Sequence, residues 1–535
     1  RPKSKKRKKE AEATVGGEVP IHLLAIGAGL LFAFSRTLWA YATLAEVYTL
    51  NSAFIAALTW LMIRWWRTGA MRTLYLAALL FGLGLGVHHV TMGLTLAGFA
   101  ALVLAVAGRA FFQRREFLVA AAIAFLGLAV YAYLPAAASR NPDLNWGDPD
   151  SPSRILAHIT GKQYRTYFGA TAESVGTEMS ELVWQLFREF APPLLPVALF
   201  LAALGFWSLL RSRRPAFWML LATAVSAGAW GLIYPIVHDK DAYALPIIFM
   251  LALAAACGVE ELLAHIRSES ARRAAGFATL ALAAIALGWN FRIANRSDYT
   301  YARDYAENAL RSVEPGGLLV TGEWQLLSPL LYLQTVEHAR PDVTVLSVFF
   351  DDWYLDYVER RLSRVLVGSE AQHAWYHRTL TADATERNRA SDELLLSILD
   401  QESQRRPVYL SFDIAVSPFE RYADFVRRIV GKYDLVPTGL VFQLHRERGI
   451  HIPKDIPLEL RGLVEYRARA ETNDIIVTEI IPTYRSLLVM RGRYLALNRR
   501  LPEAIAAYEQ AVALMPEDIA AAAELAQLRE LAARR

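Results

Sequence analysis

Long apolar runs alternate with short polar connections through the first 290 residues. An apolar run of about 20 residues can cross a bilayer as a helix, and slightly shorter runs suffice when their ends are anchored. The pattern therefore predicts about nine membrane helices, near residues 21–37, 47–63, 73–87, 90–108, 116–135, 194–210, 216–235, 243–263 and 272–290. We interpret residues 21–290 as a polytopic α-helical membrane domain, preceded by a basic segment at 1–20.

The arginines fix a predicted orientation for these helices. The chain starts with RPKSKKRKKE, and the other arginine-rich connections lie at 64–72, 109–115, 211–214 and 265–273. Cytoplasmic loops carry an excess of Lys and Arg, and strict alternation places all of these segments on the inside. The long loop 136–193 and everything after about 291 then lie outside. An interaction of the basic run with nucleic acid or anionic lipid is the weaker interpretation.

Composition agrees with a membrane domain followed by a soluble one. Of the 535 residues, 54% are hydrophobic and 20% charged, and the apolar residues are concentrated in the first half. The only cysteine, Cys257, excludes a disulfide framework and a cysteine metal site. The basic start is followed by a polar spacer, so no signal peptide is predicted. Without an initial Met, we expect an N-terminal portion to be missing.

Glu46 lies between the first two apolar runs, in WAYATLAEVYTLN. An ionisable group at the mouth of a membrane helix costs several kcal/mol if it faces lipid, so it normally faces a protein interior or a watery cavity. The alternative is a solvated residue at a helix end.

Ionisable residues gather on the predicted outer side, whereas the inner loops contain arginines but almost no carboxylates or paired histidines. Such a gathering favours a binding or active site, although outer loops are also polar for ordinary reasons. The outer residues are Glu46, His88, His89, Asp148, His238, Asp239, Lys240 and Asp241.

The outer loop 136–193 has a pattern of its own. Asn145-Trp146-Gly147-Asp148-Pro149 is turn chemistry, because Gly and Asp tolerate unusual backbone angles and Pro fixes the exit. Loops of this length are usually functional or disordered. Trp146 and the tyrosines also fit an interfacial aromatic belt. A short amphipathic helix on the membrane surface is predicted from Ile155, Leu156, Ile159 and Tyr164.

A small α/β domain is predicted at 291–450, because residues 316–349 follow a strand, helix, strand pattern. Gly316-Gly317 lacks the pattern of a phosphate-binding loop. The cluster Asp351-Asp352-Trp353-Tyr354 could line an acceptor groove, but it is more often the start of a helix. Further strands are expected at 408–412 and 441–445, with helices near 351–366 and 417–431.

The last segment, 451–535, resembles one tetratricopeptide unit in YRSLLVMRGRYLALNRRLPEAIAAYEQAVALMPED. Small residues such as Ala504 and Ala511 would let two helices approach closely. Since three or more repeats are usually needed to bury a continuous core, this helical tail either packs on the α/β domain or holds an acceptor protein.

Four ordered blocks resemble a known family of polytopic proteins grouped with the GT-C-type glycosyltransferases. The family was formerly of unknown function and is related to an animal endoplasmic-reticulum protein O-mannosyltransferase that acts on plexin IPT domains. The blocks are SRTLWAYATLAEVYTLN (35–51), GLGLGVHHVTMGL (82–94), YLPAAASRNPDLNWGDPDSPSRILAHITGKQYR (133–165) and HDKDAYALPIIF (238–249).

The resemblance implies a GT-C-like fold and transfer of a sugar from a polyprenyl phosphate to an acceptor hydroxyl, with inversion. The leaving phosphate needs cations or hydrogen-bond donors, for which the candidates are Arg36, His88, His89, Arg140, His238 and Lys240. A carboxylate base must activate the hydroxyl, for which the candidates are Glu46, Asp148, Asp239 and Asp241. The substrate-loop candidates from the same blocks are Tyr48, Asn51, Asn145, Trp146 and Tyr164.

The sequence departs from the family in one respect. GT-C enzymes generally carry the catalytic carboxylate in the first outer loop, here expected as a Gly-Asp-x-Gly-Glu-like motif, and none lies upstream of residue 20. If that motif lies in a missing segment, Glu46 and Asp239 are supporting residues.

The alternative function is a non-enzymatic transporter, flippase or receptor for lipid-linked glycans. Transporters commonly show internal repeats and charges at mid-membrane, whereas here no repeat is evident and the charges lie at one face. A third, weaker interpretation assigns the activity to the tail and anchoring to the helices.

No metal motif has convincing spacing, although a divalent cation, Mg²⁺ or Mn²⁺, could bridge donor phosphate and carboxylates. The expected partners are a polyprenyl-phosphate-linked sugar, a protein or glycan acceptor and membrane lipid, with no nucleic acid. The Ala, Leu and Arg bias favours a bacterial inner membrane, with a periplasmic catalytic face.

Overall fold

The chain folds into two compact units. Residues up to Ala137 together with Asp150–Ser297 form a helical unit, and Ala138–Pro149 together with Asp298–Arg535 form a sheet unit. The predicted division into 1–20, 21–290, 291–450 and 451–535 is finer than these two units and stays a prediction. The computed structural model describes residues 21–142, 144–162, 172–189, 195–234, 240–348, 352–380, 382–416, 420–470 and 474–534.

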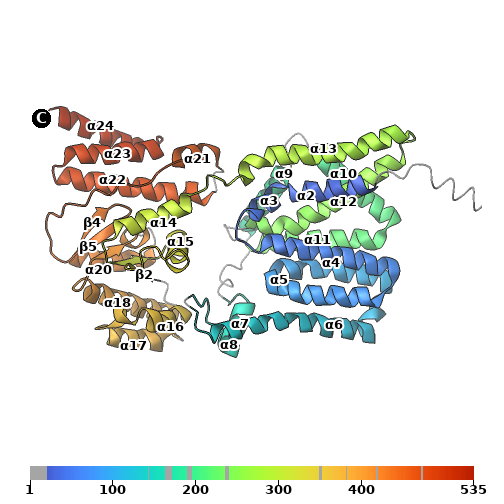
Figure 1. Cartoon of the computed structure of the whole chain (residues 1–535), viewed down its shortest axis with the longest axis horizontal. Coiled ribbons are helices and arrows are strands. Elements are labelled where there is room, and N and C mark those ends of the chain that lie inside the picture. The colour runs from blue at the N-terminus through green and yellow to red at the C-terminus, as the bar shows by residue number, and fades with distance from the viewer. Residues whose placement is uncertain are drawn as a thin grey trace, which may run out of the picture. The chain divides into compact units, whose positions relative to one another are not determined.

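The helical unit consists of helices throughout its described residues (Figure 1). Its elements are α2 (Ile21–Ala33), α3 (Arg36–Ala42), α4 (Tyr48–Thr68), α5 (Met71–Ala107), η1 (Arg109–Gln113), α6 (Arg115–Gly127), η2 (Leu128–Ala132), α7 (Tyr133–Ala138), α8 (Pro152–Ile159), α9 (Ala172–Arg188), α10 (Leu195–Ser212), α11 (Arg214–Ile233), η5 (Lys240–Ala244), α12 (Leu245–Ala264) and α13 (Glu269–Ala294).

Among the described residues, five helical stretches are long and apolar enough to cross a membrane, or six if the bent pair α2–α3 counts as one span. The predicted membrane character is therefore confirmed, with fewer qualifying spans than the nine runs. α10 is too short, and α4 contains two arginines and several polar residues that lower its hydropathy. The five stretches are Met71–Ala107, Arg115–Ala138, Arg214–Ile233, Lys240–Ala264 and Glu269–Ala294.

Helix α5 folds back on itself at His88. His88 has φ −153° and ψ 96°, which is not helical. In a straight helix Phe81 and Phe99 would lie about 27 Å apart, yet their ring centroids are 6.5 Å apart. The two arms can be followed in Figure 1. The turn predicted at His88-His89 is thus confirmed, and the two arms correspond to two of the predicted runs.

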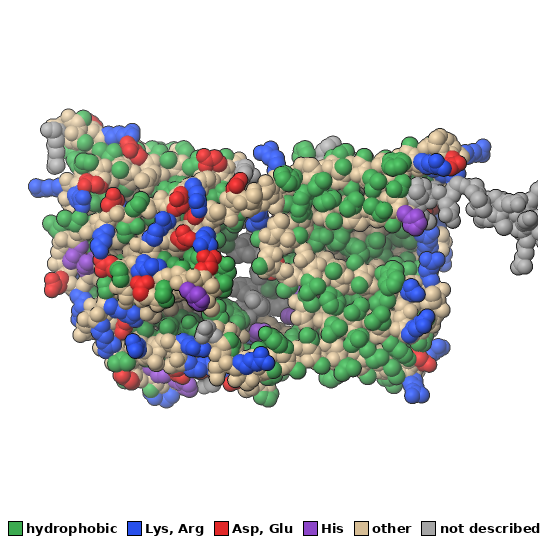
Figure 2. Space-filling view, in the orientation of Figure 1, with side chains coloured by type: hydrophobic (Ala, Val, Ile, Leu, Met, Phe, Trp, Pro, Cys, Tyr) green, Lys and Arg blue, Asp and Glu red, His purple; other side chains and the backbone are tan. Residues whose placement is uncertain are grey.

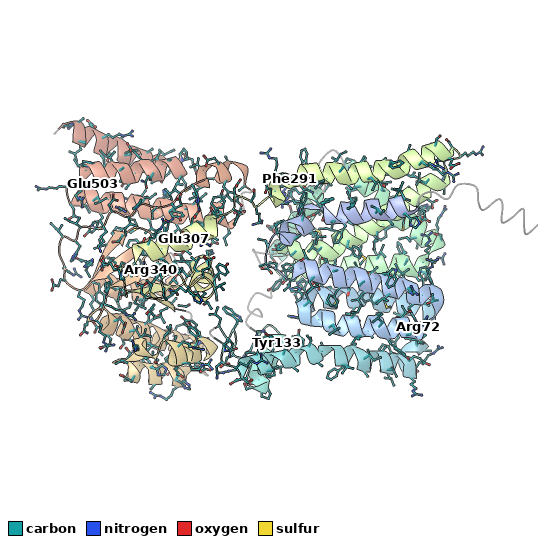
Figure 3. All side chains as sticks on the ribbon, in the orientation of Figure 1. Arg72, Tyr133, Phe291, Glu307, Arg340 and Glu503 are labelled. Atoms are coloured by element: carbon teal, nitrogen blue, oxygen red, sulfur yellow. The ribbon has the colours of Figure 1, made fainter. Side chains whose placement is uncertain are left out.

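The arginine-rich connections lie together at one end of the helical unit. Trp65, before the α4–α5 turn, packs on Phe111 of η1 with ring centroids 5.8 Å apart. Arg213, between α10 and α11, pairs with Glu260 near the end of α12 at 2.7 Å. Figure 2 shows Lys and Arg side chains gathered at this end of an otherwise apolar unit, and Figure 3 labels Arg72 there. The helices therefore alternate as predicted, while the orientation in a membrane stays a prediction.

The sheet unit combines one mixed sheet with helices. Its elements are α14 (Tyr301–Ser312), β1 (Leu318–Thr321), α15 (Trp324–Thr335), β2 (Thr344–Ser347), α16 (Asp352–Arg361), η6 (Ser363–Leu366), α17 (Glu370–Thr379), α18 (Ala384–Glu402), β3 (Val408–Leu410), α19 (Phe412–Ala415), α20 (Glu420–Lys432), β4 (Asp434–Thr438), β5 (Val441–His445), α21 (Leu463–Arg469), the π-helix η7 (Ile476–Ile480), α22 (Ile481–Leu497), α23 (Leu501–Leu514) and α24 (Ile519–Ala533).

The sheet has the order β2-β1-β3-β5-β4. β1 pairs in parallel with β2 and β3, with Leu318 opposite Thr344 and Val408. β5 runs antiparallel to β3 and to β4. The strand–helix–strand unit predicted at 316–349 is confirmed as β1–α15–β2. The sequence analysis missed β4, whose Asp434 and Pro437 are residue types depleted in strands.

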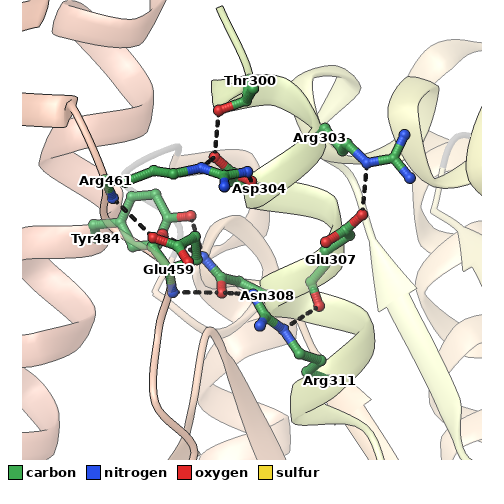
Figure 4. A network of polar contacts seen from close by, with 9 residues as sticks. All are labelled: Thr300, Arg303, Asp304, Glu307, Asn308, Arg311, Glu459, Arg461 and Tyr484. Atoms are coloured by element: carbon green, nitrogen blue, oxygen red, sulfur yellow. Dashed lines mark hydrogen bonds and ion pairs between the residues drawn. The ribbon is translucent and has the colours of Figure 1, made fainter. Parts of the chain in front are cut away.

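One hydrophobic core runs through the sheet and the C-terminal helices. A polar network joins them as well (Figure 4). The fully buried Asn308 of α14 donates hydrogen bonds to the Tyr484 hydroxyl of α22 at 2.6 Å and to the Glu459 carbonyl at 2.9 Å. Arg461 forms an ion pair with buried Asp304 at 2.8 Å. The tetratricopeptide resemblance of the tail stays a prediction.

Candidate functional site

An aromatic cluster brings three of the predicted blocks together at the end of the helical unit away from the arginines. Tyr48, at the start of α4, lies between Tyr41 of α3 and His88, with ring centroids 4.9 Å and 5.2 Å away. Tyr243 of η5 covers His88 from another side at 5.4 Å. Residues more than 150 positions apart in the chain therefore meet at one place.

His88 has a fixed neutral tautomer. The Thr91 backbone N–H donates to its Nδ1 at 3.3 Å, and the Thr91 hydroxyl lies 2.7 Å from the same atom. Asn51 Nδ2 donates to that hydroxyl oxygen at 2.7 Å, which leaves the hydroxyl hydrogen for Nδ1. A backbone amide can only donate, so Nδ1 accepts and the neutral ring carries its proton on Nε2. His88 can therefore offer an N–H donor.

Asn51 is buried beside this histidine. Its side chain is only 2% exposed, and its Oδ1 has no hydrogen-bond partner among the residues that the structure describes. An unpaired buried carbonyl oxygen costs about 1–3 kcal/mol. Asn51 Oδ1 is therefore an unused acceptor inside the protein, beside His88.

Among the residues that the structure describes, Asp241 is a carboxylate that borders the aromatic cluster. The Tyr41 hydroxyl donates to its Oδ1 at 2.7 Å. Gln185 of α9 donates to its backbone carbonyl at 2.8 Å. The side chain of Asp241 is exposed, so it is both oriented and accessible, as a general base requires.

Glu189 is a buried carboxylate that the sequence analysis missed. It accepts hydrogen bonds from the backbone N–H of Thr37, at 3.0 Å, and from the Thr37 hydroxyl, at the start of α3. Asn290 of α13 donates to the Glu189 backbone carbonyl at 3.2 Å. The Glu189 side chain is buried, with 1% exposed. It fixes the end of α9 to the break between α2 and α3.

Lys240 is already engaged by two carboxylates of α9. Its ammonium forms ion pairs with Glu178 and with Glu181, the latter at 2.9 Å. A phosphate bound by Lys240 would compete with these partners, so its predicted donor-binding role stays a prediction.

The other predicted residues of the helical unit lie around this cluster. Glu46 is exposed in the turn between α3 and α4, which agrees with the alternative of a solvated residue at a helix end. Its catalytic role stays a prediction. His89 is exposed, with its ring 6.2 Å from that of His88. The half-buried Arg36 donates its backbone N–H to the Glu189 carbonyl at 3.3 Å. Tyr164, His238 and Asp239 lie outside the described residues.

Four predicted residues belong to the sheet unit, in the segment 138–149. Asp148 is buried, and Arg360 of α16 donates to it at 3.1 Å. Asn145 donates to the other oxygen of the same carboxylate. Trp146 packs on Trp324 of α15, with ring centroids 5.2 Å apart. The fourth residue, Arg140, is exposed.

A pair of carboxylates lies at the edge of the sheet where β1 and β3 end. Glu323 follows β1 and Asp413 follows β3, and the two strands are parallel neighbours. The Asp413 backbone N–H donates to Glu323 Oε1 at 3.3 Å, and the Tyr305 hydroxyl donates to Oε2 at 2.5 Å. Burial raises the pKa of Glu323 to about 7, and it also raises the pKa of Asp413. Both Glu323 oxygens and Asp413 Oδ1 have protein partners, so a role in holding the ends of β1 and β3 accounts for the pair.

Among the described residues, no group of three or more His, Cys, Asp or Glu side chains is arranged to hold a metal ion. A divalent cation therefore remains an untested expectation.

Comparison with known proteins gave one match. Residues 3–111 match the family model described as the protein O-mannosyl-transferase TMEM260 N-terminal domain. No curated protein and no solved structure matched the chain. This match covers 109 of the 535 residues and bears out the predicted relation to the animal protein O-mannosyltransferase family.

Proposed function

We propose that the chain is a GT-C-type membrane glycosyltransferase. It moves a sugar, such as mannose, from a polyprenyl-phosphate carrier to a Ser or Thr hydroxyl of an acceptor protein. The observation that carries the proposal is the meeting of Tyr48, His88 and Asp241 at one end of an apolar helical unit. The family relation of residues 3–111 supports the reaction class.

In the proposed reaction Asp241 accepts the proton of the acceptor hydroxyl. The hydroxyl oxygen attacks the anomeric carbon, the bond from that carbon to the phosphate oxygen breaks, and the electron pair leaves with the polyprenyl phosphate. Attack opposite the leaving group inverts the configuration. The Nε2–H of His88 donates to a phosphate oxygen, where negative charge develops. Asn51 Oδ1 accepts a hydrogen bond from a sugar hydroxyl.

We place the site end on the periplasmic side of a bacterial inner membrane, with the sheet unit on the same side. The positive-inside rule supports this orientation, because the opposite end carries the arginines. The tail either packs within the sheet unit or contacts the acceptor. Addition of a chelator distinguishes a reaction in which Mg²⁺ or Mn²⁺ bridges the phosphate from a metal-free reaction, because only the former loses transfer.

The test uses the full chain in detergent, radiolabelled polyprenyl-phosphate sugars and membrane-extract acceptors. Asp241→Asn is expected to lower transfer by at least 10²-fold, the range for loss of a general base, with little change in donor binding. Glu46→Gln and Asp239→Asn test the other two predicted carboxylates. Glu116→Gln, in the first turn of α6 at the arginine-rich end, is the matched control and should transfer normally.

Two outcomes would refute the proposal. Unchanged transfer in Asp241→Asn would remove the assigned base. Tight donor binding without transfer to any acceptor, equal in all variants, would favour the transporter or receptor for lipid-linked glycans.

A further inference from the structure

Helix α9 distributes its polar and apolar side chains in the opposite way to a surface helix of a soluble protein. A surface helix normally turns its apolar stripe to the core and its polar residues to water. In α9 and the residue that follows it, the most deeply buried side chains are polar and at most 9% exposed: Glu178, Gln185 and Glu189. Leu182 and Leu186 are partly buried beside them and pack on the core of the helical unit. The large side chains on the open side are apolar and 41–61% exposed: Met179, Val183, Trp184 and Phe187. The small Ser180 lies among them.

The polar face is paired with the candidate site. Gln185 holds the backbone of Asp241, Glu178 pairs with Lys240, and Glu189 binds the start of α3. The inward face is therefore committed to the protein. The large apolar side chains of α9 are left exposed.

The middle of α9 packs against α11, one of the candidate membrane spans, short of the C-terminal end of α11. The Leu182 Cδ2 atom is 3.9 Å from the position that a Cβ would take on Gly228 of α11. Gly228 precedes the last residue of α11, Ile233, by five residues, or about 7–8 Å along the axis. The 20 residues of α11 span about 30 Å, the thickness of the hydrocarbon core. Leu182 is thus at the depth of the acyl chains.

The other end of α9 is anchored at a similar level. Asn290, which donates to the Glu189 carbonyl, precedes the end of α13 at Ala294 by four residues. α13 is also one of the candidate spans. α11 continues the exposed apolar surface at this level, with Val225 60% and Ile233 45% exposed. α9 therefore packs against spanning helices at this level and, like α11, exposes large apolar side chains there.

We propose that the face formed by Met179, Val183, Trp184 and Phe187 docks in the acyl-chain region of the bilayer. α9 then lies in the membrane without crossing it, as the wall between the lipid and the polar site. The occupant is bilayer lipid, because the face is apolar, is at hydrocarbon depth and adjoins a spanning helix. The guanidinium of Arg188 lies 5.9 Å from the Trp184 ring centroid, at the end of this face. This inference does not depend on the sugar-transfer reaction.

The test is spin-label accessibility in the full chain, reconstituted in phosphatidylcholine nanodiscs. The only native thiol is removed by Cys257→Ala, and single cysteines replace Val183 or Met179. Oxygen concentrates in the acyl region, whereas a water-soluble nickel chelate is excluded from it. Labels at both positions are expected to collide with oxygen several-fold more often than with the chelate.

Two reference sites keep the result interpretable. Val225→Cys on α11 reports the lipid-facing value, and Leu497→Cys, at a residue 84% exposed in the sheet unit, reports the water-facing value. Values at 183 and 179 that match the Val225 reference support the proposal. Values that match Leu497 would overturn it. Low collision rates with both reagents would also overturn it and would indicate cover by protein, either a second copy or another partner. Size-exclusion elution of each variant that matches the Cys257→Ala parent shows that the variants are folded.

Discussion

The buried carboxylate pair after β1 and β3 should make the sheet unit less stable as the pH rises. The pKa of Glu323 is raised from 4.5 to about 7 because its side chain is buried beside Asp413. A carboxyl whose pKa is raised by folding stabilises the folded state fully below its unfolded pKa. That contribution is lost as the pH rises through the folded pKa. The relevant window is therefore pH 4.5 to about 7.

The size of the effect follows from the same values. One pKa unit corresponds to 1.36 kcal/mol, so the rise from 4.5 to about 7 corresponds to about 3 kcal/mol of unfolding free energy. Glu323→Gln has no charge to bury, and its amide oxygen can still accept from Tyr305. We expect this variant to be about 3 kcal/mol more stable than wild type at pH 8 and nearly equal to it at pH 4.5.

Peptide-resolved hydrogen exchange on the full chain measures this locally. Protection factors of the β1 and β3 amides, corrected for intrinsic exchange, are compared at pH 5, 6, 7 and 8. A difference of about 3 kcal/mol corresponds to about 10²-fold in protection when opening of the sheet limits exchange. Glu307→Gln is the control, because its ion pair with Arg303 is on the surface and surface pairs contribute about 0–1 kcal/mol.

The reasoning would be refuted by wild-type protection that does not change between pH 5 and 8. It would also be refuted if Glu323→Gln lost protection at pH 8, because the ionised carboxylate would then be stabilising.

Two further predictions concern buried hydrogen bonds. Thr91→Val removes the hydroxyl between Asn51 and His88, so we expect transfer to fall about tenfold, equivalent to about 1.4 kcal/mol; Thr91→Ser, which keeps the hydroxyl, should stay near wild type. Equal rates in a transfer assay of both variants would contradict the role of the hydroxyl. Asn308→Ala leaves the Tyr484 hydroxyl and the Glu459 amide without their partner, so we expect a loss of about 2–4 kcal/mol. Hydrogen exchange in α22 should rise, whereas Arg311→Ala, a change at the rim of the network, should cost under about 1 kcal/mol.

Patterns with a short range in sequence predicted much of the fold. The apolar runs located the helices, and the polar pair His88-His89 marked the fold-back of α5, because a bilayer-length arm ends on each side of it. Short apolar runs containing β-branched residues located β1, β2, β3 and β5. These elements depend mainly on local propensity and burial, which the sequence carries directly.

Features that depend on tertiary pairing were not predicted. Glu189 has an ordinary sequence context, and its importance comes from Thr37, 152 positions away. The polar residues Glu178, Gln185 and Glu189 do recur at helical spacing, with large apolar residues between them, and that signal could have identified the reversed face of α9. The packing of segment 138–149 in the sheet unit depends on Arg360 and Trp324. No spacing rule connects residues so far apart.

The segment 138–149 gives the two units an interlaced topology. The chain leaves the helical unit after Ala137, returns at Asp150, and leaves again after Ser297. The sheet unit is therefore assembled from two pieces of chain, and a fragment beginning at 298 would lack one of them. In such a fragment Arg360 would lose its buried carboxylate and Trp324 its aromatic cover. Ribosomal synthesis also completes this short piece about 170 residues before β1, so it must wait until Trp324 of α15 and Arg360 of α16 have emerged.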